Sequence, residues 1–387
     1  MQDQDLAVGA DGAVGLVSPK SLVTHRAPNL LRLDSGRKLG PITQVYETYG
    51  KINRARDNAV LVFHALSGDH HAAGRHGPDD DKPGWWDNMI GPGKAFDTER
   101  VFVICANVIG GCRGSTGPAS VNPATGAPYG GTFPVVTLRD MIRAQKALID
   151  HLRIRNLLAV TGSSMGGMMA LQWAIEFPRS VRCVIPIATA AYQSPQNIAL
   201  QEVGRRAIMS DSRWNGGDYY GGAAPEGGLS VARMIGHISY LSDRTMWDKF
   251  GRRLRNGGGS QLAYRFIPEF QVETYLRHQG EVFVKRFDAN SYLHITKAID
   301  YFDLTKGSKS PTLAARLRPV RARFLILSFT SDWLYPVERS VELTEALKVS
   351  GKVVRHETIQ STYGHDACFL EANRMSPLIR DFLGTNR

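Results

Sequence analysis

Residues 157–171 read LLAVTGSSMGGMMAL, an apolar run that breaks at a Gly-x-Ser-x-Gly turn and resumes with helical character. In a sharp strand-to-helix turn of this kind the central serine has a strained backbone, and only small residues fit two positions before and after it. Gly162 and Gly166 hold those positions. We therefore predict that Ser164 is a nucleophile, with the amide of Met165 at the helix N-terminus placed to stabilise an oxyanion.

A structural turn in which Ser163 or Ser164 merely caps the helix is the alternative interpretation. It leaves the second and third glycines of the turn unexplained. The surrounding residues also favour the catalytic interpretation, because apolar or small side chains lead into the turn and a helix able to pack on a sheet leads out of it.

Composition places the chain among enzymes with one large core and an insertion. It has 387 residues, 43% of them hydrophobic. Residues 1–21 carry Gln and Asp where a signal peptide has Lys or Arg, and no run is long enough to cross a bilayer. We expect a cytoplasmic protein that does not bind membranes.

The net charge of +11 does not require a nucleic-acid partner, because the basic residues are dispersed along the chain. A small polyanion such as coenzyme A is a sufficient explanation, although charge alone does not select it. The four cysteines have no metal-ligand spacing, and we expect them to be reduced and structural. They are Cys105, Cys112, Cys183 and Cys368.

Apolar, β-branched runs predict the strands of a doubly wound, mainly parallel α/β sheet. They lie at residues 44–49, 59–64, 101–106, 156–162, 182–188, 324–330 and 352–358. Helical patterns at 138–152, 165–176 and 337–349 alternate with them.

A change from strand patterns to helical patterns after residue 188 predicts a helical lid. Helical patterns at 194–209, 229–242, 270–287 and 290–298 replace the strands, and the Gly-rich loop 256–260 is expected to be mobile. We predict core residues 1–188 and 315–387, with the lid inserted at 189–314.

A serine nucleophile needs a general base and a group that orients that base. Asp332 directly follows the strand predicted at 324–330, at the strand end where open sheets bind ligands. His365 lies in a loop after the last predicted strand, beside a glycine. The order Ser164, Asp332, His365 resembles that of α/β-hydrolase folds, in which a second oxyanion amide comes from the loop after an early strand. Leu66 is our candidate for it.

Other histidines fit this role less well. His151, His237 and His294 lie in helical patterns and His356 lies in a strand, so a packing role is the stronger interpretation. A further cluster is made up of His70, His71, His76, Asp79, Asp80 and Asp81. Adjacent histidines on one extended segment point in different directions, so we expect no metal site there.

Several motifs together resemble the homoserine O-acetyltransferase family of α/β-hydrolase-fold enzymes. They are GSSMGGMMALQWA at 162–174, HALSG at 64–68, GWWD at 84–87, IGPGK at 90–94, GGCRGSTGP at 110–118, ARMIGHISYLS at 232–242 and GHD at 364–366. The resemblance implies ping-pong transfer of an acyl group from acyl-CoA, through Ser164, to the hydroxyl of L-homoserine. It implies no cofactor besides acetyl-CoA as co-substrate, and a homodimer formed through the helical insertion.

The resemblance also assigns substrate-binding positions. Arg233 is implied for the carboxylate of homoserine and Asp366 for its ammonium group, which suits a planar guanidinium and a carboxylate beside the base. Tyr240, further along the same helical pattern, is expected to add a hydrogen bond.

The acyl donor is predicted from Leu334. Succinyl-using relatives tend to have an arginine at this position, two residues after the triad aspartate, so an apolar side chain favours acetyl. Arg113 could reach the site from another loop, and serine is an alternative acceptor. A serine esterase with the same triad is the more distant alternative.

Overall fold

The computed structural model describes residues 13–255, 262, 264–306 and 312–384. An eight-stranded sheet forms the centre of the molecule, in the order β1-β4-β6-β5-β7-β8-β9-β10. The first two strands in this order pair antiparallel with their neighbours, and β6 through β10 run parallel. The strands are β1 (Lys20–Thr24), β4 (Ile42–Tyr49), β5 (Ala59–Phe63), β6 (Phe102–Ala106), β7 (Leu157–Ser163), β8 (Val181–Ile187), β9 (Arg323–Phe329) and β10 (Val354–Ile359).

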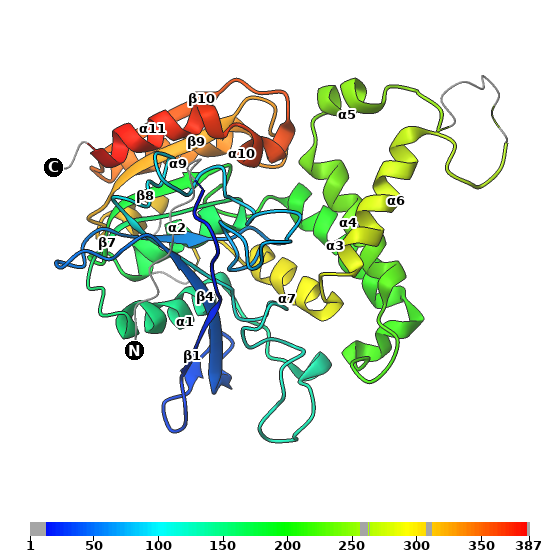
Figure 1. The fold of residues 1–387 in the computed structure, drawn as a ribbon, viewed down its shortest axis with the longest axis horizontal. Coiled ribbons are helices and arrows are strands. Elements are labelled where there is room, and N and C mark those ends of the chain that lie inside the picture. The colour runs from blue at the N-terminus through cyan, green and yellow to red at the C-terminus, as the bar shows by residue number, and fades with distance from the viewer. Residues whose placement is uncertain (1–12, 256–261, 263, 307–311, 385–387) are drawn as a thin grey trace.

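Apolar packing covers both faces of this sheet because successive side chains of a strand point to opposite sides. Leu61 and Phe63 of β5 join one core cluster, and Val60 and Val62 join the other. The first cluster packs on α1 (Leu138–His151), α2 (Met165–Glu176) and α9 (Val337–Val349). The second cluster packs on α11 (Ala372–Gly384), which lies along β9 in Figure 1.

After β8 the chain forms five successive α-helices before residue 306. They are α3 (Pro195–Ser210), α4 (Glu226–Tyr240), α5 (Asp243–Phe250), α6 (Gln271–Val284) and α7 (Ala289–Asp300). Helices α3 to α6 stand apart from the sheet, and α7 lies between them and the rest of the molecule (Figure 1). The division at residues 189 and 314 stays a prediction, and the short helix α8 (Leu313–Leu317) lies across its second boundary. The loop predicted to be mobile at 256–260 falls outside the described residues.

The predicted strands and helices are present with ends shifted by a few residues, and α2 and α9 match their predicted bounds. The pattern missed β1 and the small pair β2 (Leu31–Arg32) and β3 (Lys38–Leu39), because these short strands bury few side chains. It also missed α5, the short α10 (Ala367–Leu370) and α11, and Pro377 inside α11 interrupts its helical pattern. None of the described helices has the length and apolar character needed to span a bilayer.

Candidate active site

Ser164 lies at the turn between β7 and α2 with a strained backbone, at φ 57° and ψ −121°. A positive φ is uncommon for a residue with a side chain. The turn is tight because it packs on the end of β5. A Cβ at Gly162 would lie 2.4 Å from the carbonyl oxygen of Phe63, and one at Gly166 would lie 2.1 Å from the same atom. The two glycines are therefore required by close backbone approach, as the sequence predicted.

The backbone amides of Met165 and Leu66 are the predicted oxyanion donors. Met165 is the first residue of α2, where amides have no intrahelical acceptor. Neither its amide nor that of Leu66 donates to another protein group in the part of the chain that the structure describes. The loop of Leu66 is fixed from the lid, because Arg286 Nη1 donates to the carbonyl oxygen of Ser67 at 2.9 Å.

His365 and Asp332 form a buried pair at the carboxyl ends of β10 and β9. Nδ1 of His365 lies 2.8 Å from Oδ2 of Asp332, and the two residues are 4% and 3% exposed. The second carboxylate oxygen accepts the amides of Leu334 and Tyr335 at 3.0 and 2.9 Å, so the carboxylate is held in one orientation. Burial lowers the pKa of His365, but the Asp332 carboxylate outweighs it and leaves the pKa above 6.5.

The turn that carries His365 contacts the lid closely. Gly364 has φ +71°, and a Cβ there would lie 2.5 Å from the amide of Ser242 and 2.7 Å from the carbonyl of Tyr240. The Tyr240 ring lies 6.1 Å from the His365 ring, centroid to centroid. The end of α4 therefore rests directly on the base.

Sequence reasoning missed Tyr335, which contacts both the predicted nucleophile and the predicted base. Its ring is 5.2 Å from the His365 ring, and its hydroxyl donates to Oε1 of Gln193 at 3.1 Å. Burial and the Asp332 carboxylate raise the pKa of Tyr335, while hydrogen bonding with Gln193 and Ser164 acts in the opposite direction. The structure thus brings Ser164 and His365 together against one buried phenol. The position of Tyr335, three residues after Asp332, was the only indication in the sequence that it lies at the site.

Arg233 is a cation without a carboxylate partner among the described residues. It lies on α4, with its guanidinium carbon 4.6 Å from the centre of the Phe283 ring and 5.7 Å from that of Tyr240. Its Nε is buried and has no hydrogen-bond acceptor. Asp366, next to the base, is buried enough to raise its pKa, although His365 and Arg233 act against that rise. A carboxyl group thus lies next to His365, and a cation lies beside the Tyr240 ring that packs on it.

A cavity of about 40 Å³ lies beside these groups. Leu66, Tyr240, Leu334 and Tyr335 all line it, together with residues of α3 and α4. Three of the predicted site residues therefore meet in one small space. Arg113 is directed elsewhere, because its Nε lies 3.6 Å from Oδ2 of Asp69 and its side chain is 40% exposed.

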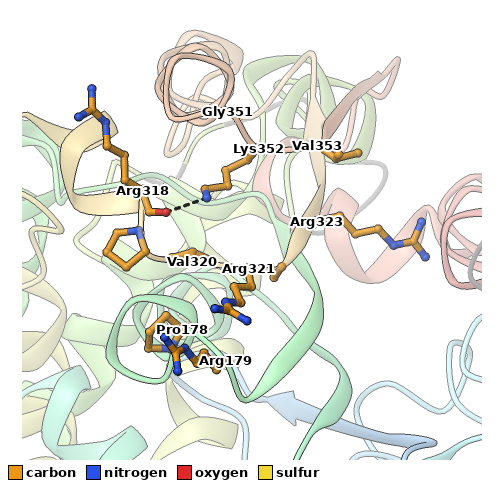
Figure 2. A pocket seen from close by; sticks show the side chains of 11 residues that line it. Pro178, Arg179, Arg318, Val320, Arg321, Arg323, Gly351, Lys352 and Val353 are labelled. Carbon is orange, nitrogen blue, oxygen red and sulfur yellow. Dashed lines mark hydrogen bonds between the residues drawn. The ribbon is translucent and has the colours of Figure 1, made fainter.

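The larger cavity shown in Figure 2, of about 600 Å³, is not at this site. It is lined by Pro178, Arg179, residues 318–323 and residues 351–353, which precede β8, β9 and β10. It therefore opens at the amino ends of the strands, whereas Ser164, Asp332 and His365 follow their carboxyl ends. A strand of seven residues separates the two ends by about 23 Å.

The remaining histidines considered as bases have other surroundings. His151 ends α1 and is exposed. Nδ1 of His237 lies 3.0 Å from the Tyr275 hydroxyl, and His294 packs edge-on against Phe133. Nε2 of His356 lies 2.8 Å from Oγ of Ser328. All four cysteines are free, and three of them are buried.

Comparisons with known proteins agree with this geometry. A family model for the alpha/beta hydrolase fold matches residues 58–372. A homoserine O-acetyltransferase from Methanohalobium evestigatum is 55% identical over 359 residues, which are 93% of this chain and 72% of the relative. The crystal structure of a homoserine O-acetyltransferase from Bacillus anthracis matches with a TM-score of 0.87 and 30% identity, over 96% of this chain and 98% of that chain.

A second solved structure carries a different activity in its name. Esterase E22 matches with a TM-score of 0.86 and 29% identity, over 95% of this chain and all of the esterase chain. The predicted fold is confirmed by these matches, and so is the family resemblance. The chain belongs to the homoserine O-acetyltransferase family of α/β-hydrolase-fold proteins.

Proposed function

We propose that this protein transfers an acetyl group from acetyl-CoA to the side-chain hydroxyl of L-homoserine, a step toward methionine. The observation that carries the proposal is Arg233, an unpaired and partly buried guanidinium on the lid helix that rests on His365. A cation partly removed from water is stabilised by a directly paired anion, and no carboxylate of the described residues forms an ion pair with Arg233, although Asp366 lies within electrostatic reach. The carboxylate of an amino-acid substrate would do so.

In the first half-reaction Ser164 attacks the thioester carbonyl of acetyl-CoA. His365 accepts the serine proton, and Asp332 stabilises the imidazolium that forms. The oxyanion binds between the amides of Leu66 and Met165. CoA leaves as the thiol after it takes the proton from His365, and an acetyl ester remains on Ser164.

In the second half-reaction homoserine enters the same site. Arg233 binds its carboxylate through two hydrogen bonds and Asp366 binds its ammonium group. These contacts direct the acceptor hydroxyl toward His365, which deprotonates it as it attacks the ester. The bond from the acetyl carbon to Ser164 Oγ then breaks, and His365 returns the proton to that oxygen. Tyr240 borders the same cavity and is placed to contribute a further hydrogen bond. Each step uses only this chain's own groups and the two substrates.

The lining of the cavity near His365 favours an acetyl over a succinyl donor. Leu334 lines that cavity and presents an apolar side chain, so a succinyl carboxylate would lose hydration there without gaining a cation. Arg113 does not compensate, since Asp69 already holds it. Arg286 lies near Arg113 and Arg233, and burial followed by these two positive charges lowers its pKa. A guanidinium in this setting suits a phosphate of CoA.

Hydrolysis is the second candidate function, and the likeness to esterase E22 favours it. The two activities differ in what removes the acetyl group from Ser164. In an assay with acetyl-CoA, release of free CoA thiol should be slow alone and should rise steeply when L-homoserine is added. Equal release with and without homoserine would contradict the transferase proposal. Parallel assays with succinyl-CoA and with L-serine test the donor and the acceptor.

We also propose that the protein is a cytoplasmic homodimer associating through the lid. Apolar side chains are exposed on its helices, with Val203, Val231, Ile238 and Trp247 between 44% and 63% exposed. Exposed apolar groups concentrated on one region are typical of protein interfaces. The four free cysteines accord with a reducing compartment. Light scattering coupled to gel filtration measures the mass in solution. The wild type should have the mass of two chains and Trp247→Lys that of one, and a monomeric wild type would contradict the dimer.

A further inference from the structure

A cluster of polar side chains lies apart from Ser164, around the buried carboxylate of Glu47 in β4. Oε1 of Glu47 lies 2.5 Å from Nε2 of His76 and 3.7 Å from Nε2 of His70. Oε2 accepts the Tyr49 hydroxyl at 2.7 Å and lies 3.0 Å from Nδ1 of His71. Glu47 itself is fully buried.

Three of these groups converge as metal ligands do. The donor atoms of Glu47, His70 and His76 all lie within 4.8 Å of one another. Zinc binds imidazole nitrogen and carboxylate oxygen at about 2.0–2.2 Å, so modest movements would bring all three atoms to bonding distance. The His76 side chain is 41% exposed and has room to make that adjustment.

His70 gives an independent indication that a partner is missing. Its side chain is 90% buried, yet neither ring nitrogen makes a hydrogen bond to any residue that the structure describes. Nδ1 has no partner, and Nε2 faces Glu47 Oε1 beyond hydrogen-bonding distance. A cation between Nε2 and the carboxylate would give that nitrogen the partner it lacks.

We propose that Glu47, His70 and His76 bind one divalent transition-metal ion, with zinc the best match to two imidazoles and a carboxylate. Water completes the coordination. Tyr49 and His71 hold the other carboxylate oxygen, as outer-shell partners of ligating carboxylates do. The sequence-based expectation of no site rested on adjacent histidines pointing apart. In the structure His70 and His71 face different oxygens of the same carboxylate, which comes from a distant strand.

The ion would hold the loop after β5 in position. That loop runs from Leu66, the predicted second oxyanion donor, to His76, and Tyr49 already ties it to β4 through the amide of Ala72 at 2.8 Å. The metal touches no reacting atom, so it acts as a positioning site. The inference does not depend on the proposed acyl transfer.

Zinc binding to the full chain, stripped of metal and without substrates, tests the proposal. Titration with zinc against a chromophoric chelator should show one tight equivalent in the wild type. His70→Ala and His76→Ala should each bind at least about tenfold more weakly, because loss of even an outer-shell partner weakens metal sites by that much. His151→Ala removes an exposed histidine at the end of α1 and should bind like the wild type.

A wild type that binds zinc no more tightly than the two cluster variants would overturn the proposal. His70 is buried and its variant could fold poorly, so circular dichroism is recorded for each protein. The half-exposed His76 then decides the result. As a second readout, one equivalent of zinc should raise the Tm of the wild type and of His151→Ala, but not that of His76→Ala. An unchanged wild-type Tm would also count against the site.

Discussion

The two ends of the parallel strands differ in how they present their charged groups. At the amino ends the larger cavity is lined by Arg179, Arg318 and Arg321, all exposed to solvent (Figure 2). At the carboxyl ends the cavity is far smaller, but Asp332 and His365 are almost fully buried and bonded to each other. Cavity volume alone would therefore have placed the active site at the wrong end of the strands.

The two ends differ in how strongly water solvates and screens their charged groups. Exposed arginines are solvated and screened, so they have little effect on reactivity. A buried pair beside a strained serine acts in a low dielectric, where hydrogen bonds and charges have larger effects. Variants at the two ends should therefore differ greatly in their effect on activity.

The largest effect is expected from Ser164→Ala. It removes the nucleophile, and turnover of acetyl-CoA with homoserine should fall about a million-fold, as when the serine of another triad is lost. Steady-state assays measure the loss, and an unchanged melting curve shows that the fold is intact. Retention of substantial turnover would show that another group carries the acetyl.

Asp332→Asn should reduce turnover by about ten thousand-fold. The amide keeps the shape of the carboxylate but favours the wrong tautomer of His365 and cannot stabilise its charged form. The rate of Ser164 acetylation by acetyl-CoA, followed by rapid-quench mass spectrometry, is the measurement. A loss of less than tenfold would remove Asp332 from the catalytic set.

Arg233→Ala should weaken use of homoserine while acetylation of Ser164 continues. Hydrogen bonds to charged groups contribute about 1.5–3 kcal/mol, so the KM for homoserine should rise about 10- to 150-fold. Arg179→Ala, at the other end of the strands, is the matched control and should change neither half-reaction. Equal loss of both half-reactions in Arg233→Ala would contradict its role.

The pH dependence follows from the raised pKa of His365. Only the neutral imidazole accepts the serine proton, and Asp332 favours the charged form. Activity should therefore fall as pH drops through a pKa above 6.5, by about tenfold for each unit below it. A profile of kcat/KM for acetyl-CoA from pH 5 to 9 measures it. A half-maximum well below 6.5 would show that Asp332 does not act on the base.

The smallest effect is expected from Leu334→Arg. A guanidinium at the edge of the cavity can pair with a succinyl carboxylate, which at a partly exposed position contributes about 1 kcal/mol, or about fivefold in preference. Competition between acetyl-CoA and succinyl-CoA gives the ratio directly. If the ratio does not move, another residue selects the donor.

The sequence predicted the features of the carboxyl end that depend on short-range pattern. The Gly-x-Ser-x-Gly turn, Asp332 after its strand and His365 beside Gly364 were all visible in the chain. Tyr335 was missed because its role depends on the packing of its ring against His365. Glu47 was missed for a similar reason, since only the sheet brings β4 to the histidines of a later loop.

Intact-protein mass spectrometry of the acylated protein shows whether Ser164 carries the acetyl group. Mixed with acetyl-CoA alone, the protein should gain the mass of one acetyl group, and peptide mapping should place it on Ser164. Addition of L-homoserine should clear the adduct and yield O-acetylhomoserine. An adduct on any other residue, or product formed by Ser164→Ala at the wild-type rate, would contradict the account.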